Sequence, residues 1–162
     1  MAISVGDTLP EASFMVLGGE GPAAMPSADV WGGKTVVIFG LPGAYTGTCS
    51  TAHVPSFIRT AEAFKAKGIA GIYCVSVNAP FVLGAWSEAT GAGAAGIVML
   101  GDAEAAFTKA IGLDFSAPPV GLIDRSKRYA MVVEDGKVTV LHVEDNPGVC
   151  ETSGGEALLE AI

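Results

Sequence analysis

Short apolar runs alternate along the chain with longer segments whose apolar residues recur at helical spacing. The run Thr35–Gly40 (TVVIFG) is rich in β-branched residues and ends at Gly and Pro, which is typical of a strand buried on both faces. The runs Ile69–Val77 and Ile97–Leu100 have the same character. The pattern therefore predicts three buried strands, each followed by a helix.

The three predicted helices are defined by their apolar faces. In the first, the apolar positions are Val54, Phe57, Ile58, Ala61 and Phe64. In the second they are Val82, Ala85, Trp86 and Ala89. In the third they are Ala103, Ala106, Phe107, Ala110 and Ile111. We expect Gly68 to end the first helix, Pro55 to kink or restart it, and Asp102 to cap the third.

The end of the chain adds a hairpin and a last helix. Tyr129–Glu134 and Lys137–Val143 read as strands, and Asp135-Gly136 between them is a strong two-residue turn. Further on, Ser153 with Glu156 forms a capping-box pattern ahead of a short C-terminal helix.

In this order the elements predict an α/β protein with a mixed central sheet and helices on both faces. A thioredoxin-like fold fits the order best. The Gly- and Pro-rich segments Leu17–Pro26 and Ser116–Pro119 are expected to be surface loops. No repeat or linker divides the chain, so residues 1–162 are expected to form one domain.

Charge and composition narrow the range of partners. The chain has 9 basic and 17 acidic residues, and the resulting net charge of -8 disfavours binding to nucleic acid or anionic membranes. Apolar residues make up 50% and charged residues only 16%, which hints at a surface covered by a second subunit. The opening MAISVGDTLP resembles no secretory signal, and no apolar span is long enough for a membrane, so we expect a cytoplasmic protein.

The candidate chemistry lies in the segment GLPGAYTGTCS, Gly40–Ser50. Three cysteines are too few and too irregularly spaced for a disulfide framework, so they are expected to be thiols. Cys49 falls in the first turn after a strand, where a helix N-terminus stabilises a thiolate and should lower its pKa. The alternative is a small buried side chain without chemistry. Thr46 stands where a C-x-x-C enzyme would carry its other thiol, which disfavours disulfide isomerase chemistry.

The pattern P-x-x-x-T-x-x-C, formed by Pro42, Thr46 and Cys49, resembles the active-site motif of the peroxiredoxins. Further stretches, LPGAYTGTCSTAHVPSF, AEAFKAKG, YCVSVNAPFVLGAW and KRYAMVVEDGKV, are similar to the type-II (five-type) subfamily over most of the chain. The motif alone is moderately specific, whereas the set is strong.

The resemblance implies a role for each matching residue. Cys49 would be the peroxidatic nucleophile, which a hydroperoxide oxidises to a sulfenic acid. Thr46 would hydrogen-bond the thiolate and the peroxide, Pro42 would shield the pocket from water, and Arg128 would stabilise the thiolate and the polarised peroxide. The resemblance also implies a homodimer, no metal or organic cofactor, and re-reduction by glutathione, glutaredoxin or thioredoxin.

The resemblance leaves the resolving thiol open. Cys150 resembles the C-terminal resolving cysteine of animal members but lies about two residues early. Cys74 matches a cysteine used by some plant members, although a strand cysteine is usually inert. We favour Cys150 as the intramolecular resolving thiol, and a one-cysteine mechanism that uses glutathione, glutaredoxin or thioredoxin directly is nearly as well supported. Gly47 also departs from the family, because many relatives carry proline there.

Two other functions stay open at this point. One is a redox-sensing or interaction protein on the same fold, without efficient peroxide turnover. The other is a Cys–His hydrolase or metal site, because His53 lies four residues after Cys49 and would share its face on a continuous helix. His53 more simply borders the pocket or packs locally, and His142 is most simply a sheet residue.

Overall fold

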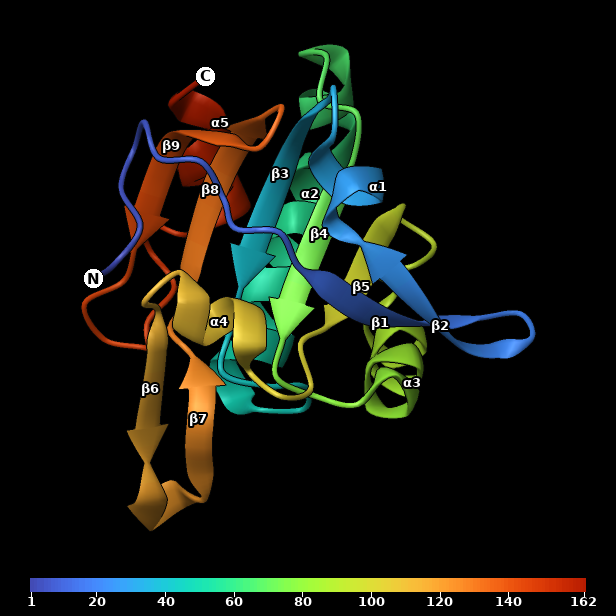
Figure 1. Ribbon diagram of the computed structural model, residues 1–162, viewed down its shortest axis with the longest axis vertical. Helices are drawn as coiled ribbons and strands as arrows, with labels where there is room; N and C mark the ends of the chain where they lie inside the picture. Colours follow the sequence, from blue (N-terminus) through green and yellow to red (C-terminus); the bar gives the residue numbers. More distant parts are fainter.

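The computed structural model describes every residue from Met1 to Ile162 and is built around a seven-stranded mixed sheet (Figure 1). The strand order is β2-β1-β5-β4-β3-β8-β9; β5, β4 and β3 are parallel, and the other neighbours are antiparallel. The strands are β1 (Ser13–Gly18), β2 (Gly21–Pro26), β3 (Thr35–Gly40), β4 (Ile72–Ser76), β5 (Ile97–Gly101), β8 (Tyr129–Glu134) and β9 (Lys137–Val143). A separate hairpin of β6 (Asp114–Ala117) and β7 (Leu122–Ser126) projects from the body.

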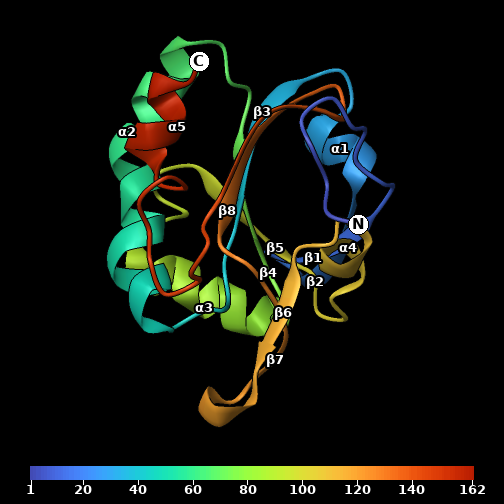
Figure 2. The same cartoon turned by 90° about the vertical axis from the view of Figure 1, so that its left-hand side faces the viewer.

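Helices cover both faces of the sheet, as expected. The helices are α1 (Ser27–Trp31), α2 (Val54–Ala66), α3 (Pro80–Thr90), α4 (Ala106–Ala110) and α5 (Gly155–Glu160). Figure 2 shows α2, α3 and α5 on one face and α1 and α4 on the other. None of them combines the length and hydrophobicity that crossing a membrane requires.

The central strand β3 separates two apolar cores. Val37 and Phe39 point into the core under α2, α3 and α5, whereas Val36 and Ile38 point into the core under α1 and α4. Phe39 stacks on Phe57 of α2 with ring centroids 4.1 Å apart. Since side chains alternate along a strand, burial of both faces requires the continuous apolar run seen in the sequence.

Several local predictions are confirmed. The hairpin turn at Asp135 and Gly136 has positive φ at both residues, as a two-residue turn of this kind requires. Gly68 has a φ of 88° just beyond the end of α2. Pro55 restarts the helix: one π-helical turn, Cys49–His53, precedes it, and α2 begins at Val54.

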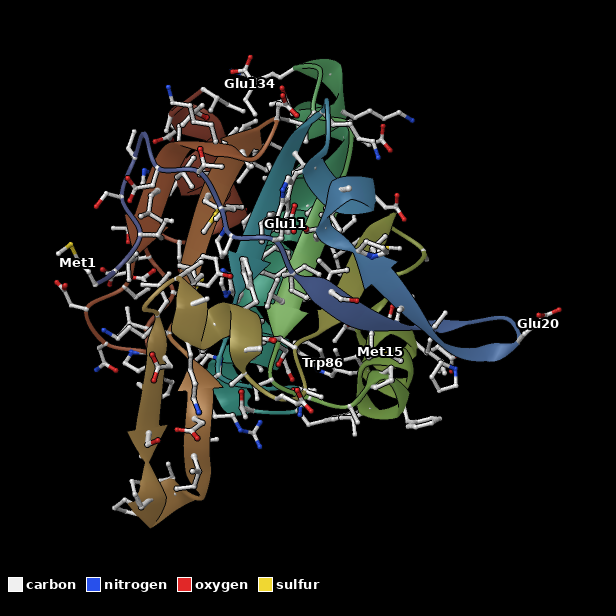
Figure 3. The ribbon with its side chains drawn as sticks, in the orientation of Figure 1. Met1, Glu11, Met15, Glu20, Trp86 and Glu134 are labelled. Atoms are coloured by element: carbon white, nitrogen blue, oxygen red, sulfur yellow. The ribbon has the colours of Figure 1, made fainter.

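The first of the two loop predictions is wrong, and the second holds only for Pro118 and Pro119. Leu17–Pro26 belongs mostly to the β1–β2 hairpin, whose tip at Glu20 points into solvent (Figure 3). Because β2 is an edge strand and is largely exposed, it tolerates Pro22 and Pro26 and shows no apolar alternation. Ser116–Pro119 ends β6 and enters a short 3₁₀ turn, Pro118–Val120.

Three details of the helices are also corrected. In α3 the buried residues include Leu83 and Trp86, whereas most of the face predicted for it is exposed, because this helix is apolar nearly all round. Asp102 does accept hydrogen bonds from the backbone at the start of α4, but the N-cap position itself is Ala105. Only Phe107 and Ile111 of the predicted inner face of α4 are buried.

The predicted capping box at the C-terminal helix is wrong. α5 begins after Gly154, which has no side chain to cap it; the first N–H of the helix, that of Gly155, donates instead to Ser56 Oγ of α2 at 2.9 Å. The hydroxyl of Ser153 instead donates to Glu144 Oε2 at 2.6 Å, because a carboxylate is the stronger acceptor. Ser153 thereby fixes the segment before α5 to the end of β9.

Candidate active site

The loop that follows β3 is fixed by the end of β4. Asn78 Oδ1 accepts hydrogen bonds from the Ala44 N–H at 3.0 Å and from the Ser76 hydroxyl at 2.6 Å. Gly43 lies so close to Arg125 that a Cβ there would stand 2.9 Å from the guanidinium. The loop is therefore held where two parallel strands end, and it leads directly into the π-helical turn.

Cys49 opens that turn and has no solvent-exposed surface. Arg128 Nη2 donates to Cys49 Sγ at 3.1 Å, although the two residues are 79 positions apart. The neighbouring Ser50 is fixed from α3, because Trp86 Nε1 donates to its hydroxyl at 3.0 Å; Trp86 points from α3 towards this segment in Figure 3. A buried cation thus faces the sulfur.

Arg128 lies between β7 and β8, and its side chain is buried. Besides Cys49, it donates from Nη1 to His53 Nδ1 and from Nε to the carbonyl of Pro147, each at 2.9 Å. The two ion pairs of the structure involve other residues, so no carboxylate contacts this guanidinium. Its positive charge is therefore not neutralised by an ion pair and can act on the Cys49 sulfur and on a ligand bound beside it.

A cavity of about 320 Å³ adjoins the site and brings together three of the four predicted residues, Pro42, Thr46 and Arg128. Its other wall is the β6–β7 hairpin, which contributes Phe115, Ala117, Val120 and Leu122. The Thr46 hydroxyl donates to the Gly43 carbonyl at 2.8 Å, not to Cys49. Because its only proton is used in this way, Thr46 Oγ1 is available as an acceptor for a ligand in the cavity.

His53 is fully buried in the same π-helical turn as Cys49 but makes no hydrogen bond to the sulfur. Arg128 Nη1 can only donate, so Nδ1 accepts, and Nε2–H donates to the Ser153 carbonyl at 3.0 Å. Burial, together with the nearby Arg128 charge, lowers the pKa of His53 to about 3. Both ring nitrogens are occupied, so the Cys–His pair considered from spacing is contradicted.

The other two thiols differ in their surroundings. Cys74 is fully buried in β4, and burial raises the pKa of its thiol well above the usual value. Cys150 is half-buried in the loop between β9 and α5, and burial raises its pKa as well. That loop is bound to the site through the Pro147 carbonyl and through Thr48, whose hydroxyl donates to the Gly148 carbonyl at 2.7 Å.

Comparison with known proteins agrees with this geometry. The family model described as Redoxin matches residues 4–159. The chain is 42% identical to Peroxiredoxin-2C of Oryza sativa subsp. japonica, over 99% of this chain and 98% of the relative. It is 47% identical to the mitochondrial Peroxiredoxin-2F of Arabidopsis thaliana, over 85% of this chain and 68% of the relative.

The chain belongs to the peroxiredoxin family. Among solved structures, reduced Prx3 of Vibrio vulnificus in complex with hydrogen peroxide is 45% identical, with a TM-score of 0.91 over 98% of each chain. This peroxiredoxin is therefore a thiol-dependent peroxidase with a thioredoxin-like fold, as the motifs and the element order predict.

Sequence reasoning missed two polar groups of the peroxiredoxin site. Asn78 directly follows an apolar strand, and such a position at the carboxyl end of a parallel strand is a usable signal. The bond between His53 and Arg128 carries no local signal, because 75 residues separate the two. It follows only from the pairing of β3 with β8, which brings Arg128 beside the turn after β3.

The burial of His53 predicts a pH dependence of the peroxiredoxin's stability. The unfolded chain binds a proton at His53 below about pH 6.5, whereas the folded protein excludes it down to about pH 3. The contribution of the neutral His53 ring to the free energy of unfolding is therefore fully present above the unfolded pKa of 6.5. Below that pH the free energy of unfolding falls as the pH decreases, by up to about 1.4 kcal/mol per pH unit. Urea unfolding of the wild type and of His53→Asn between about pH 7 and pH 5 measures the effect.

Removing the imidazole should flatten this dependence. The matched control is His142→Asn, which makes the same change at the histidine of β9. Glu144 does not disturb this measurement. Burial alone would raise its pKa, but hydrogen bonds from Ser153 and Glu151 outweigh burial and lower it, so the contribution of Glu144 to the free energy of unfolding is lost only at more acid pH. Equal slopes in the wild type and His53→Asn would contradict the prediction.

Proposed function

We propose that Cys49 is the peroxidatic nucleophile and that this enzyme reduces hydrogen peroxide and alkyl hydroperoxides. The observation that carries the proposal is the 3.1 Å contact between Arg128 Nη2 and Cys49 Sγ beside the cavity. A guanidinium in a protein stays protonated, so it stabilises both the thiolate and the negative charge that develops on the peroxide. No general base is then needed at the sulfur.

Thr46 and Pro42 are proposed to prepare the peroxide for attack. Because the Thr46 hydroxyl donates its hydrogen bond to the Gly43 carbonyl, Thr46 Oγ1 accepts a hydrogen bond from the peroxide hydroxyl and orients the O–O bond towards the sulfur. Pro42 is buried and lines the cavity, where it restricts access of water. Both roles depend on the loop that Asn78 fixes.

The proposed oxidation proceeds in two steps and is followed by reduction. The Cys49 thiolate attacks one peroxide oxygen, the O–O bond breaks, and the products are a sulfenic acid and an alkoxide or hydroxide that takes up a proton. A second thiol then attacks the sulfenic sulfur, forming a disulfide and releasing water. Two electrons from an external thiol reductant restore both sulfurs.

We propose Cys150 as the resolving thiol, with glutathione, glutaredoxin or thioredoxin as the reductant. Cys150 lies in a loop whose residues Pro147 and Gly148 are bonded to the active site, and no strand holds it. Burial raises the pKa of both thiols, but it raises that of Cys74 well above the usual value, and Cys74 is held inside the sheet without exposed surface. The alternative is direct reduction of the sulfenic acid by the external thiol.

Stopped-flow oxidation of reduced protein, followed by mass spectrometry of the three thiols, tests this function. We expect oxidation at Cys49 far faster than that of free cysteine, a Cys49–Cys150 disulfide in the wild type, and a trapped sulfenic acid in Cys150→Ser. Cys74→Ser is the matched control and should retain the disulfide. Unchanged turnover of Cys150→Ser would support the one-cysteine mechanism, and slow oxidation of Cys49 would support a redox-sensing protein.

The exposed surface of the molecule bears on its assembly. Large apolar side chains are exposed, among them Tyr45 of the loop after β3, Phe81 of α3 and Val120 between β6 and β7, and a second copy of the chain would cover them. We therefore propose a homodimer, which sedimentation velocity tests. We also propose that residues 1–162 act as one domain and that the protein works in the cytoplasm, a reducing compartment in which its three cysteines would stay thiols.

A further inference from the structure

Arg125 is a cation beside the active-site cavity that the peroxidase reaction, as derived above, does not use. Its guanidinium stands against the loop after β3: Nη1 is 3.5 Å from the Pro42 carbonyl, and a Cβ at Gly43 would meet it at 2.9 Å. Pro42 lines the cavity, so the guanidinium lies at the cavity's rim. The side chain is half-buried, and a charge partly withdrawn from water is costly unless it has a partner.

A β-bulge turns Arg125 towards the cavity. Phe115 of β6 is paired with Arg125 of β7. Two residues further along β6, Ala117 is paired with Leu122, which lies three residues before Arg125. The extra residue in β7 shifts its alternation, so Leu122 and Arg125 project from the same face of the hairpin. That face is the cavity wall, because Phe115, Ala117 and Leu122 all line the cavity.

The residue that forms the bulge leaves Arg125 without a carboxylate. Asp124 has a φ of 50°, and its N–H donates to the Ser116 hydroxyl at 2.9 Å. Its carboxylate pairs with Lys109 of α4 at 3.0 Å, and the other ion pair of the structure joins α2 to α5. The long contact with the loop carbonyl is the only hydrogen bond of the Arg125 side chain, so most of its five donors are free.

The cavity thus has three parts that suit three parts of one ligand. Thr46 and Arg128 form a polar end for a hydroperoxide group, and the hairpin supplies an apolar wall for a hydrocarbon body. At the rim, a guanidinium with free donors can bind a carboxylate through two parallel hydrogen bonds. Hydrogen peroxide would use only the polar end, whereas an alkyl hydroperoxide that carries a carboxylate would use all three parts.

We propose that Arg125 is a substrate-binding residue and that this enzyme prefers organic hydroperoxides that carry a carboxylate. The inference rests on the proposed role of Cys49 and names the substrate class of that site. The chemical step is unchanged: the thiolate takes the terminal oxygen, the O–O bond breaks, and the organic product is the corresponding hydroxy acid. The net charge of -8 repels anions at long range, so a preference for a carboxylate requires a local cation.

Paired probes separate the carboxylate from the rest of the substrate. β-Hydroperoxyisovalerate is a short carboxylate-bearing hydroperoxide and linoleate hydroperoxide a long one, and the methyl ester of each removes only the charge. Stopped-flow oxidation of Cys49 gives a second-order rate constant for each probe. In at least one pair the wild type should react about fivefold to tenfold faster with the carboxylate than with its ester. This ratio should fall as the ionic strength rises from about 0.01 M to about 1 M.

Variants at position 125 assign the preference to this side chain. Arg125→Gln should lower the ratio of the carboxylate rate to the ester rate at least about threefold, and Arg125→Lys should keep most of it. The matched control is Arg59→Gln, which changes the net charge equally but removes a surface arginine of α2 that is paired with Glu156, and it should keep the ratio. A disturbance of the loop at Pro42 would slow both members of a pair alike, so the ratio does not depend on it.

The outcomes distinguish this inference from the function on which it rests. A wild-type ratio near one at both chain lengths, or an equal ratio in the wild type and Arg125→Gln, would overturn the inference. An equal fall in Arg125→Gln and Arg59→Gln would also overturn it, because net charge alone would then explain the preference. Oxidation of the wild type by hydrogen peroxide as slow as that of free cysteine would instead overturn the proposed role of Cys49.

Discussion

Replacing Arg128 with alanine is expected to slow the oxidation of Cys49 by hydrogen peroxide about 100- to 1000-fold. The guanidinium donates to the sulfur at 3.1 Å inside the protein, where Cys49 and Arg128 are 0% and 1% exposed. In the proposed mechanism, its removal withdraws the group that stabilises the thiolate before the reaction and the leaving oxygen during it. Losses of this size are typical when one fixed donor at a developing negative charge is deleted.

Trp86 offers a way to follow this reaction. Its indole donates to the hydroxyl of Ser50, next to Cys49, so its fluorescence should respond when the sulfur is oxidised. Stopped-flow fluorescence then gives second-order rate constants for the wild type and for Arg128→Ala. Arg128→Lys should lie between them, because it keeps the charge but loses the planar fork that reaches Cys49 and His53 together.

The matched control for Arg128→Ala is Arg59→Ala. Arg59 lies on α2 and pairs with Glu156 of α5 at the surface, so its removal should change the rate little. Circular dichroism and thermal melting identify any loss of rate that comes from unfolding. Equal rates for Arg128→Ala and the wild type, with both folded, would rule out the guanidinium as the stabilising group.

Most of the sheet could be predicted because its central strands are buried on both faces. Continuous apolar runs such as Thr35–Gly40 arise only under that constraint, and the strand bounds follow from Gly and Pro at the ends. The exposed β1–β2 hairpin lacks the constraint, so its glycines and prolines suggested a loop. The face of α3 was misjudged for a related reason: apolar residues also occupy its exposed side, where Phe81 and Val82 are available to a second subunit.

The candidate site could be predicted only in part. The segment from Pro42 to Cys49 is local, and its chemistry follows from one cysteine at the start of a helix. Arg128 could be assigned only through the family resemblance, because nothing in KRYAMVV shows that its arginine is buried. The expected bond from Thr46 to Cys49 is absent, since a nearer acceptor, the Gly43 carbonyl, takes its proton.

Gly40→Ala is expected to destabilise the protein by about 2 to 3 kcal/mol, although alanine is usually more favourable than glycine inside a strand. Gly40 ends β3 and is paired with Tyr129 of β8, whose ring lies where a Cβ at position 40 would be, with Cζ only 2.5 Å away. Tyr129 has no exposed surface, so its ring has no free space to move into. The strand or the ring must shift, and either movement strains both cores.

Urea unfolding measures this effect, and Gly47→Ala is its control. A Cβ added at Gly47 would meet no atom within 4 Å, and the residue lies at the start of a helical turn, so alanine there should be neutral or stabilise by about 0.5 kcal/mol. If Gly40→Ala were as stable as Gly47→Ala, the close approach of β3 to Tyr129 would be refuted. The strain should also reach the chemistry: Tyr129 follows Arg128 directly, so a displaced ring moves the guanidinium, and Cys49 oxidation should slow even where the variant is fully folded.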